Sequence, residues 1–523
     1  MILSFLFTPY ALVLVLVLYY LLPYLQRQGL RDIPGPVAAA FTNFWLLLQC
    51  RRGKRYLAVD KAHKKYGPLV RIQPHHVSVA DVDAINIIYG HGNGFLKSEY
   101  YDAFVSIHRG LFNTRDRAEH TRKRKTVSGT FSAKVIGQFE QYMHHNLKEL
   151  LVQWDRICAT ASTTTTTTAT GSQGKYAPID ALNWFNYLAF DIIGDLAFGA
   201  PFGMLSKGAD IAEVRMTPDA EPTYAPAIQV LNRRGEVSAT LGCLPALKKW
   251  APYSPDPFFR HGLAAVKQLA GIAVARVNAR LQAGQKSDRV DLLARLMEGR
   301  DSNGNPMGRE ELTAEALTQM IAGSDTTSNT SCALLFWCLK TPGVVEKLQT
   351  ESDEAIASGV RIPEFSTVKD LPYLKAVINE TLRIHSTSSL GLPRVVPPGS
   401  PGVTILGKHF PAGTVLSVPA YTIHHSKEIW GPDADEFRPD RWLGSGGAGG
   451  GSISDIQKAA FVPFSHGPRA CVGRNVAEME LALIVATVFR NYEFELYQTE
   501  MHTREGFLRK PLGLNVGIRR RSS

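Results

Sequence analysis

The segment that most constrains this 523-residue chain is a ten-residue loop near its C-terminus, Phe464–Gly473, which reads Phe-Ser-His-Gly-Pro-Arg-Ala-Cys-Val-Gly. Gly467 and Gly473 permit backbone conformations that turn N–H groups toward the single cysteine, Cys471. Such hydrogen bonds, with a positive charge nearby, stabilise a thiolate and adjust its donation of electrons to a metal. Apolar residues follow Gly473 at helical spacing, so the sulfur would lie at a helix N-terminus, which favours an anion.

The residue types around Cys471 leave several kinds of site open. A buried structural cysteine and a catalytic nucleophile are alternatives to a metal-bound thiolate. A zinc site is disfavoured because no CxxC or HxxxH companion lies nearby. Arg469 suits a carboxylate partner, because its planar guanidinium makes paired, charge-assisted hydrogen bonds.

The loop resembles the haem-binding signature of the cytochrome P450 superfamily, aromatic-x-x-Gly-x-Arg-x-Cys-x-Gly, at every defined position. The resemblance implies a mainly α fold with a minor β region. It also implies iron protoporphyrin IX (haem b) as cofactor, with Cys471 as the axial ligand of the iron. The remaining cofactor-binding residues of the loop would be Phe464, Gly467, Arg469 and Gly473.

A long apolar helix is expected over residues 317–340, interrupted by the polar run 322–327 (Ala-Gly-Ser-Asp-Thr-Thr). An acid followed by two hydroxyls is costly to bury in an apolar helix, although a solvent-facing polar stripe is the alternative. The run resembles the oxygen-activation motif of the superfamily. In that motif Thr326 would stabilise bound dioxygen and Asp325 would deliver protons.

Two further segments resemble paired elements of the superfamily. Glu380 and Arg383 lie three residues apart on one helix face, a spacing that is also common on exposed helices. Residues 437–442 (Phe-Arg-Pro-Asp-Arg-Trp) follow, with two mild departures from the family pattern. The resemblance implies that Glu380, Arg383 and Arg441 form a buried structural ion network behind the haem.

The two haem propionates require cationic or hydrogen-bonding partners in a poorly solvated site. By the family pattern these partners are Arg469, Arg394 and Arg124, together with His120. Most relatives carry tryptophan where this chain has His120, but an imidazole can still donate to a propionate.

Residues 95–104, 230–240 and 388–393 resemble fungal benzoate 4-monooxygenases, in the regions where the superfamily builds its substrate pocket. The resemblance implies para-hydroxylation of benzoate to 4-hydroxybenzoate with O2 and electrons from NADPH, delivered by an NADPH–cytochrome P450 reductase. Alternatives are a monooxygenase of another small aromatic (a substituted benzoate or phenylpropanoid) and a haem-binding protein without turnover.

A benzoate carboxylate inside such a pocket must find hydrogen-bond donors, because its desolvation would otherwise prevent binding. The candidate donors are Tyr100, Tyr101, Arg233, Arg234, Ser388 and Ser389.

The formal net charge is +11, but the basic residues are scattered and no nucleic-acid motif accompanies them, so no nucleic-acid partner is expected. The dense run 122–125 (Arg-Lys-Arg-Lys) is either a solvated helix face or a docking surface for an acidic redox partner. Six cysteines show no paired framework, which favours a reducing compartment.

The N-terminus carries an uncharged span from Ile2 to Leu25, long enough to cross a hydrocarbon core of about 30 Å. Arg27 and Arg31 follow it, so the positive-inside rule places the rest of the chain in the cytoplasm. With the proline hinge at 33–36, this order resembles microsomal cytochromes P450. We therefore expect a single-pass anchor at 2–25 in the lipid of the endoplasmic reticulum membrane, a basic, proline-containing linker at 26–50 and one catalytic domain at 51–523.

Overall fold

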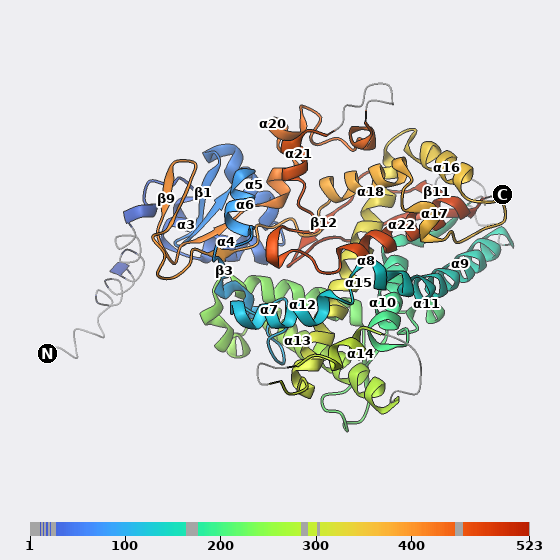
Figure 1. Cartoon of the computed structure of the whole chain (residues 1–523), viewed down its shortest axis with the longest axis horizontal. Coiled ribbons are helices and arrows are strands. Elements are labelled where there is room, and N and C mark those ends of the chain that lie inside the picture. The colour runs from blue at the N-terminus through green and yellow to red at the C-terminus, as the bar shows by residue number, and fades with distance from the viewer. Residues whose placement is uncertain are drawn as a thin grey trace.

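The computed structural model describes residues 11, 14, 17, 18, 21, 28–163, 176–283, 291–300, 304–444 and 453–521. Helices predominate; β1 (Leu69–Gln73) and β9 (Lys408–Phe410) lie at the side nearer the N-terminus, whereas β11 (Tyr492–Leu496) lies at the opposite side, near the C-terminus (Figure 1). The predicted mainly α fold with a minor β region is confirmed.

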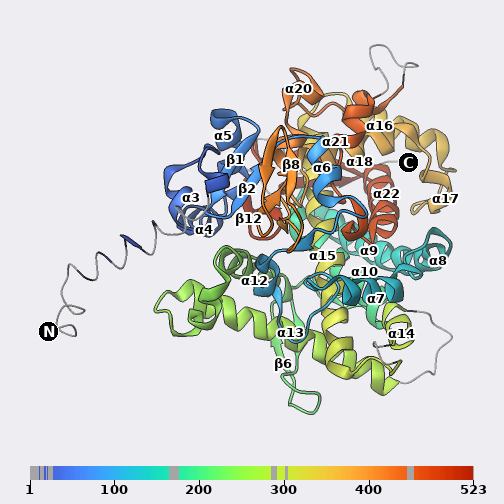
Figure 2. The same ribbon diagram turned by 60° about the vertical axis from the view of Figure 1, so that its left-hand side comes forward.

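The central element is α15 (Arg309–Lys340), which runs through the middle of the helical part (Figure 2). It packs against α10 (Ala181–Phe198), α13 (Pro257–Ala283), α18 (Pro372–Ile384) and α22 (Arg474–Asn491). These helices bring their apolar side chains into the largest core cluster of the molecule.

The predicted interruption of this helix is wrong, because α15 is helical throughout residues 322–327. The hydroxyls of Ser324 and Thr326 donate to the carbonyls of Met320 (2.8 Å) and Ala322 (2.7 Å), one turn back. Hydroxyls bonded in this way leave the helical backbone intact while satisfying polar groups inside an apolar helix.

The main sheet has five strands in the order β1 (Leu69–Gln73), β2 (His76–Val79), β10 (Val415–Ser417), β7 (Arg394–Val395) and β3 (Leu96–Lys97). In the antiparallel β3–β7 pair, Lys97 is the register partner of Arg394. The other strands are β4 (Ala177–Asp180), β5 (Ala212–Val214), β6 (Thr223–Ala225), β8 (Val403–Ile405), β9 (Lys408–Phe410), β11 (Tyr492–Leu496), β12 (Thr503–Glu505), β13 (Arg509–Pro511) and β14 (Asn515–Arg520).

The remaining α-helices are α3 (Val37–Phe41), α4 (Phe44–Arg51), α5 (Arg55–Tyr66), α6 (Asp83–Tyr89), α7 (Arg117–Ser128), α8 (Ala133–Ile136), α9 (Glu140–Thr163), α11 (Met204–Lys207), α12 (Ala227–Gly242), α14 (Leu292–Met297), α16 (Val344–Ala355), α17 (Phe365–Val368), α19 (Ala420–His424), α20 (Lys427–Trp430) and α21 (Asp455–Ala460). Short 3-10 helices used below are η2 (Glu99–Phe104), η4 (Pro245–Lys249), η5 (Ala251–Tyr253) and η7 (Gly467–Arg469).

The structure describes only part of the N-terminal region for which predictions were made. Five residues of the span 2–25 are described, so the predicted membrane anchor lies almost entirely outside the described residues. Within the described residues, none of the helices combines the length and apolar character needed to cross a bilayer. Residues 37–51 form α3 and α4, which pack on β1 and α12, so this part of the predicted linker belongs to the folded domain.

Candidate active site

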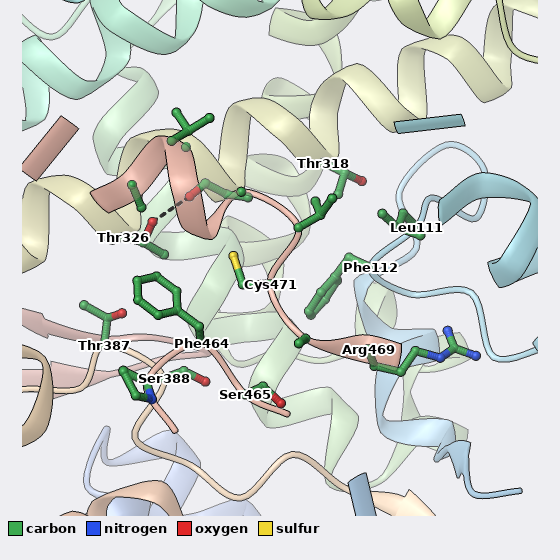
Figure 3. Close-up of a pocket in the computed structure, with 18 of the residues that line it drawn as sticks. Leu111, Phe112, Thr318, Thr326, Thr387, Ser388, Phe464, Ser465, Arg469 and Cys471 are labelled. Atoms are coloured by element: carbon green, nitrogen blue, oxygen red, sulfur yellow. Dashed lines mark hydrogen bonds between the residues drawn. The ribbon is translucent and has the colours of Figure 1, made fainter. Parts of the chain in front are cut away.

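A cavity of about 340 Å³ lies between α15, α22 and the loop Phe464–Gly473. The Cys471 side chain is accessible, and the space that it faces is this cavity. Figure 3 shows the sulfur between the rings of Phe464 and Phe112, with Thr326 beside it and the Arg469 side chain directed away from it. Most of the other lining side chains are apolar.

The cysteine loop is closed by its own backbone. The N–H of Cys471 donates to the carbonyl of Phe464 at 2.9 Å, and α22 begins three residues later. Gly467 has a φ of 70°, and a Cβ there would lie 1.9 Å from the carbonyl oxygen of Tyr89, so no other residue fits this turn. Desolvation by the surrounding cavity wall raises the pKa of the Cys471 thiol, whereas the Gly473 N–H and the nearby Arg124 charge act to lower it.

Four cations gather on the cavity wall, and we call them the cationic end: Lys97, Arg124, Arg394 and Arg469. Lys97 and Arg394 are 6% and 2% exposed and lie opposite each other across the β3–β7 pair. Like charges directly opposite in a sheet destabilise it. Burial holds the pKa of Lys97 well below its usual value, and the charges of the three arginines lower it further.

The members of the cationic end are bound to neutral oxygens. Lys97 donates to the carbonyl of Phe112, and Arg394 donates to the Tyr101 hydroxyl at 2.9 Å. Arg124 donates to the carbonyl of Ala470 at 2.6 Å. Arg469 donates to the backbone carbonyls of residues 114 (2.8 Å), 115 (3.3 Å) and 116 (3.4 Å). Among the described residues, no carboxylate forms an ion pair with any of the four.

His120 lies on the same wall and completes this set. Burial lowers the pKa of its imidazole to about 3, and the neighbouring Arg469 and Lys97 charges contribute. His120 is therefore neutral at physiological pH and offers a single N–H donor.

This donor set fits haem. A buried, one-signed cluster without an internal counter-charge requires an anionic ligand, and haem carries two propionates. The cationic end and His120 would hold the propionates, and Cys471 would bind the iron. Sequence reasoning missed Lys97. The only feature of the sequence that could have indicated it is a charged residue in a short apolar strand.

The two predicted residues of the oxygen-activation motif point in different directions. Thr326 lines the cavity, whereas Asp325 does not. Asp325 is buried on another face of α15, where it pairs with Lys510 of β13 (2.5 Å) and accepts a hydrogen bond from Asn329 (3.3 Å). Successive residues of a helix are about 100° apart, which separates these neighbours.

An acid that does line the cavity was missed by sequence reasoning. Glu480 of α22 is buried, lines the cavity and accepts a hydrogen bond from the Thr327 hydroxyl at 3.1 Å. Its other oxygen has no hydrogen-bond partner among the described residues. Burial raises the pKa of Glu480 to about 8, so this carboxyl keeps its proton at neutral pH. Its sequence signal is one acid at a core position of an apolar helix.

Of the predicted substrate residues, Tyr101 and Ser388 line the cavity, and Thr387 lies beside Ser388 (Figure 3). The other predicted substrate residues do not line the cavity: Tyr100, Arg233, Arg234 and Ser389.

The excluded residues have partners elsewhere. Arg233 pairs with Glu236 (3.1 Å), while buried Arg234 donates to the carbonyl of Phe104 (2.9 Å). Ser389 donates to the carbonyl of Ser386 at 2.6 Å. Tyr100 belongs to an aromatic cluster between η2 and α12.

The predicted ion network is present in the structure. Glu380 accepts from Arg383 (2.7 Å) and Arg441 (2.9 Å), and it also accepts from the indole of Trp442 (2.9 Å). Burial acts to raise the pKa of Glu380, but the two arginines outweigh it and hold the pKa below its usual value. The tryptophan that departs from the family pattern therefore supplies an additional donor.

The basic run 122–125 is not a solvated face. Arg122 pairs with Glu119 (2.6 Å) and Glu311, and Lys123 is buried with Glu311 and Glu315. Arg124 lines the cavity. Three of the four charges of the predicted docking surface are therefore engaged elsewhere.

Comparison with known proteins gives relatives over the whole chain. The model of the family Cytochrome P450 matches residues 34–517. Benzoate 4-monooxygenase bphA of Aspergillus niger is 66% identical over 525 residues, which cover 99% of each chain. A cytochrome P450 monooxygenase of Aspergillus terreus is 31% identical over 490 residues, covering 90% of this chain and 92% of the relative. Cytochrome P450 monooxygenase gsfF of Penicillium aethiopicum is 28% identical over 94% of this chain and 93% of the relative.

Proposed function

This chain belongs to the cytochrome P450 family, and we propose that it hydroxylates benzoate at the para position to give 4-hydroxybenzoate. The observation that carries the proposal is the 66% identity to a protein named benzoate 4-monooxygenase, over 99% of each chain. The cavity supports it, because a cysteine in a closed loop faces a largely apolar space.

When bound, haem supplies a thiolate-ligated iron that activates O2 for insertion of one oxygen atom into a C–H bond. The chain provides the surroundings for this chemistry. Leu111, Phe112, Ile193 and Leu196 line the cavity and exclude water. The hydroxyl of Thr326 and the protonated carboxyl of Glu480 also line it, so each is placed to hold a proton there.

The substrate carboxylate would be held by hydroxyl donors of the cavity wall. Because Arg394 donates to the Tyr101 oxygen, the hydrogen of that hydroxyl remains free for an acceptor. Ser388 and Thr387 offer two further hydroxyls. This arrangement would orient the para carbon away from the carboxylate anchor.

Electrons would come from NADPH through an NADPH–cytochrome P450 reductase, and residues 2–25 would anchor the protein in the endoplasmic reticulum membrane with its domain in the cytoplasm. Exposed apolar side chains near this end support the membrane proposal. Phe44 and Leu48 of α4 are exposed, as are Trp250 and Tyr253 of the segment that follows α12. α4 packs on α12, and α12 packs on η4, the element that precedes Trp250 and Tyr253.

Titration of the ferric holoenzyme with benzoate tests substrate binding, with displacement of the Soret band as the measurement. Benzamide and methyl benzoate have a similar shape without the charge. They should bind about tenfold to a hundredfold more weakly, since a hydrogen bond to a charged group contributes about 1.5–3 kcal/mol. Equal binding of the neutral analogues would contradict a carboxylate anchor.

Turnover with O2, NADPH and the reductase should yield 4-hydroxybenzoate, identified against the 2- and 3-hydroxy isomers. A different isomer, or oxidation only of other aromatics, would contradict the proposed reaction. Protease treatment of intact microsomes should digest the domain. Protection of the domain in the lumen would contradict its cytoplasmic placement.

Replacement of the cavity threonine tests its role in proton handling. Thr326→Ala should let NADPH oxidation continue while hydrogen peroxide replaces the hydroxylated product, because the hydroxyl next to the reacting oxygen is lost. Thr330→Ala, one turn further along α15 in the same wall, is the matched control. Unchanged coupling in Thr326→Ala would assign the role to another group.

A further inference from the structure

Two cysteines that are far apart in the sequence meet in the fold. The sulfurs of Cys50, in α4, and Cys243, the residue after α12, lie 3.3 Å apart. The side chains are 5% and 3% exposed and share a small apolar cluster with Leu46, Val59 and Ile72. The sequence alone gave no reason to pair these cysteines.

We propose that Cys50 and Cys243 form a peroxide-sensitive dithiol, which closes to a disulfide that fastens the end of α12 to α4. The Cys50 sulfur attacks one oxygen of hydrogen peroxide, the O–O bond breaks, and one water leaves. The resulting sulfenic acid is attacked at sulfur by Cys243, the S–O bond breaks, and a second water leaves. The two thiols are oxidised by two electrons in total, and the peroxide is reduced by two.

The contact geometry favours disulfide formation over further oxidation of Cys50 or its reaction with other thiol reagents. A disulfide bond is about 2.05 Å long, so the sulfurs must approach by only about 1.3 Å, a movement within the reach of side-chain rotation. The resolving thiol already touches the attacking one, so a sulfenic acid on Cys50 would be captured before further oxidation. The shared apolar cluster leaves little room for bulkier thiol reagents.

The surroundings assign different roles to the two thiols. Hydrogen bonding from Cys243 and the charge of Arg55 lower the pKa of Cys50, while burial opposes them. The same contact with Cys50, together with burial, raises the pKa of Cys243 well above its usual value. Because the Cys243 thiol also donates to the carbonyl of Ala239 at 3.4 Å, Cys50 is assigned as the attacking sulfur and Cys243 as the resolving one.

Among the described residues, the contact between Cys50 and Cys243 is the one that joins two cysteine sulfurs. Cys332 and Cys338 lie six residues apart in α15, a helical rise of about 9 Å, whereas a disulfide requires Cα atoms within about 7 Å. Cys158 is half-buried in α9, and Cys471 faces the cavity.

The bond would restrain one wall of the active-site region. Gly242 packs so closely on Tyr100 that an added Cβ would lie 2.5 Å from the ring, and the next residue, Tyr101, lines the cavity. Fastening residue 243 to α4 thus limits movement of α12 against η2. Oxidised protein should exchange cavity ligands more slowly than reduced protein.

Peptide mapping of the full-length holoprotein tests the proposal. After brief treatment with hydrogen peroxide and alkylation of the remaining thiols, a cross-linked peptide pair containing Cys50 and Cys243 should appear and should vanish on reduction with dithiothreitol. If both cysteines are recovered alkylated at doses that already oxidise Cys158, the proposal is wrong.

Matched variants separate the two roles. Cys243→Ser should form no cross-link and should accumulate dimedone-reactive sulfenic acid at Cys50, whereas Cys158→Ser should form the cross-link as the wild type does. Peroxide should raise the melting temperature of the wild type and of Cys158→Ser, but not of Cys243→Ser, because the bond constrains the unfolded chain. A cross-link from Cys50 to any other cysteine would overturn the assignment.

Discussion

The ion network around Glu380 and the cationic end of the cavity both bury several charges, but they compensate them differently. In the network, Arg383 and Arg441 share one carboxylate, and the spare donors of Arg383 reach the carbonyls of His424 (2.7 Å) and Ala434 (2.6 Å). At the cationic end, Lys97 and Arg394 face each other with neutral partners only.

The difference distinguishes buried charges that stabilise the fold from buried charges that bind a ligand. A buried charge is tolerated when opposite charge and hydrogen bonds replace the lost water. The network satisfies this condition within the chain, and so it holds α18 to the segment around Arg441 whether or not a ligand is present. The cationic end satisfies it only when an anion arrives from outside.

The largest effect is expected from neutralising the network. Glu380→Gln leaves the buried Arg383 guanidinium without a counter-charge and leaves Arg441 with Asp433 alone (3.3 Å). Breaking a buried pair in this way costs about 3–5 kcal/mol. We expect little folded holoprotein, with a greatly lowered melting temperature in any that is recovered. Retention of wild-type stability would show that the carbonyl contacts alone hold the two arginines.

The next effect concerns Glu480, a buried acid that forms no ion pair with the described residues and keeps its proton. Because its folded-state pKa of about 8 exceeds the ordinary value of 4.5, its contribution to stability is complete below pH 4.5 and is lost as the pH rises toward 8. We expect about 3 kcal/mol of this loss by pH 7.

The isosteric variant Glu480→Gln carries no proton to lose, so its free energy of unfolding should fall less over that range. Denaturant unfolding at several pH values measures the difference. Parallel pH profiles for the two proteins would show that the carboxyl is ionised in the folded state.

A smaller effect is expected at the cationic end, where one substitution should weaken haem binding but stabilise the haem-free protein. Arg394→Gln should weaken haem retention about tenfold to a hundredfold, since it removes a charged donor to a propionate. The same change should stabilise the haem-free protein, because it relieves repulsion from Lys97. Haem transfer to an apo-globin and thermal unfolding of the haem-free form measure the two effects. If the substitution instead destabilised the haem-free protein, Arg394 would have a structural role like that of the arginines in the Glu380 network.

The smallest effect is expected from Arg438, whose side chain is half exposed and pairs with Asp433 at 2.9 Å. Arg438→Gln should cost less than about 1 kcal/mol, because water screens an exposed pair. Arg438 lies next to the network in the sequence. The variant therefore tests whether burial, rather than position along the chain, determines how much stability is lost. A loss as large as that of Glu380→Gln would contradict the distinction.

The sequence predicted those features whose partners lie close along the chain or within a long family motif. Glu380 and Arg383 are neighbours by helical spacing, and the cysteine loop is closed by its own residues. Lys97 was missed because its position beside Arg394 depends on strand pairing between distant segments. The contact between Thr327 and Glu480 likewise depends on how α15 packs on α22.

Neighbouring residues on a helix were the other source of error. Asp325 and Thr326 are adjacent in sequence, but Thr326 lines the cavity whereas Asp325 pairs with Lys510. A motif gives the position of such residues along the chain, whereas the packing of the helix decides which of them reaches the cavity. The membrane anchor at 2–25 stays a prediction.

The cationic end also has a consequence for the life of the protein in a cell. A newly synthesised chain must gather four mutually repelling cations before its cofactor arrives, which leaves the haem-free form weakly stable. Chains that wait in this form are exposed to quality-control proteases, whereas haem binding removes them from that pool. The steady-state amount of enzyme should therefore follow the cellular supply of haem, even when its synthesis is constant.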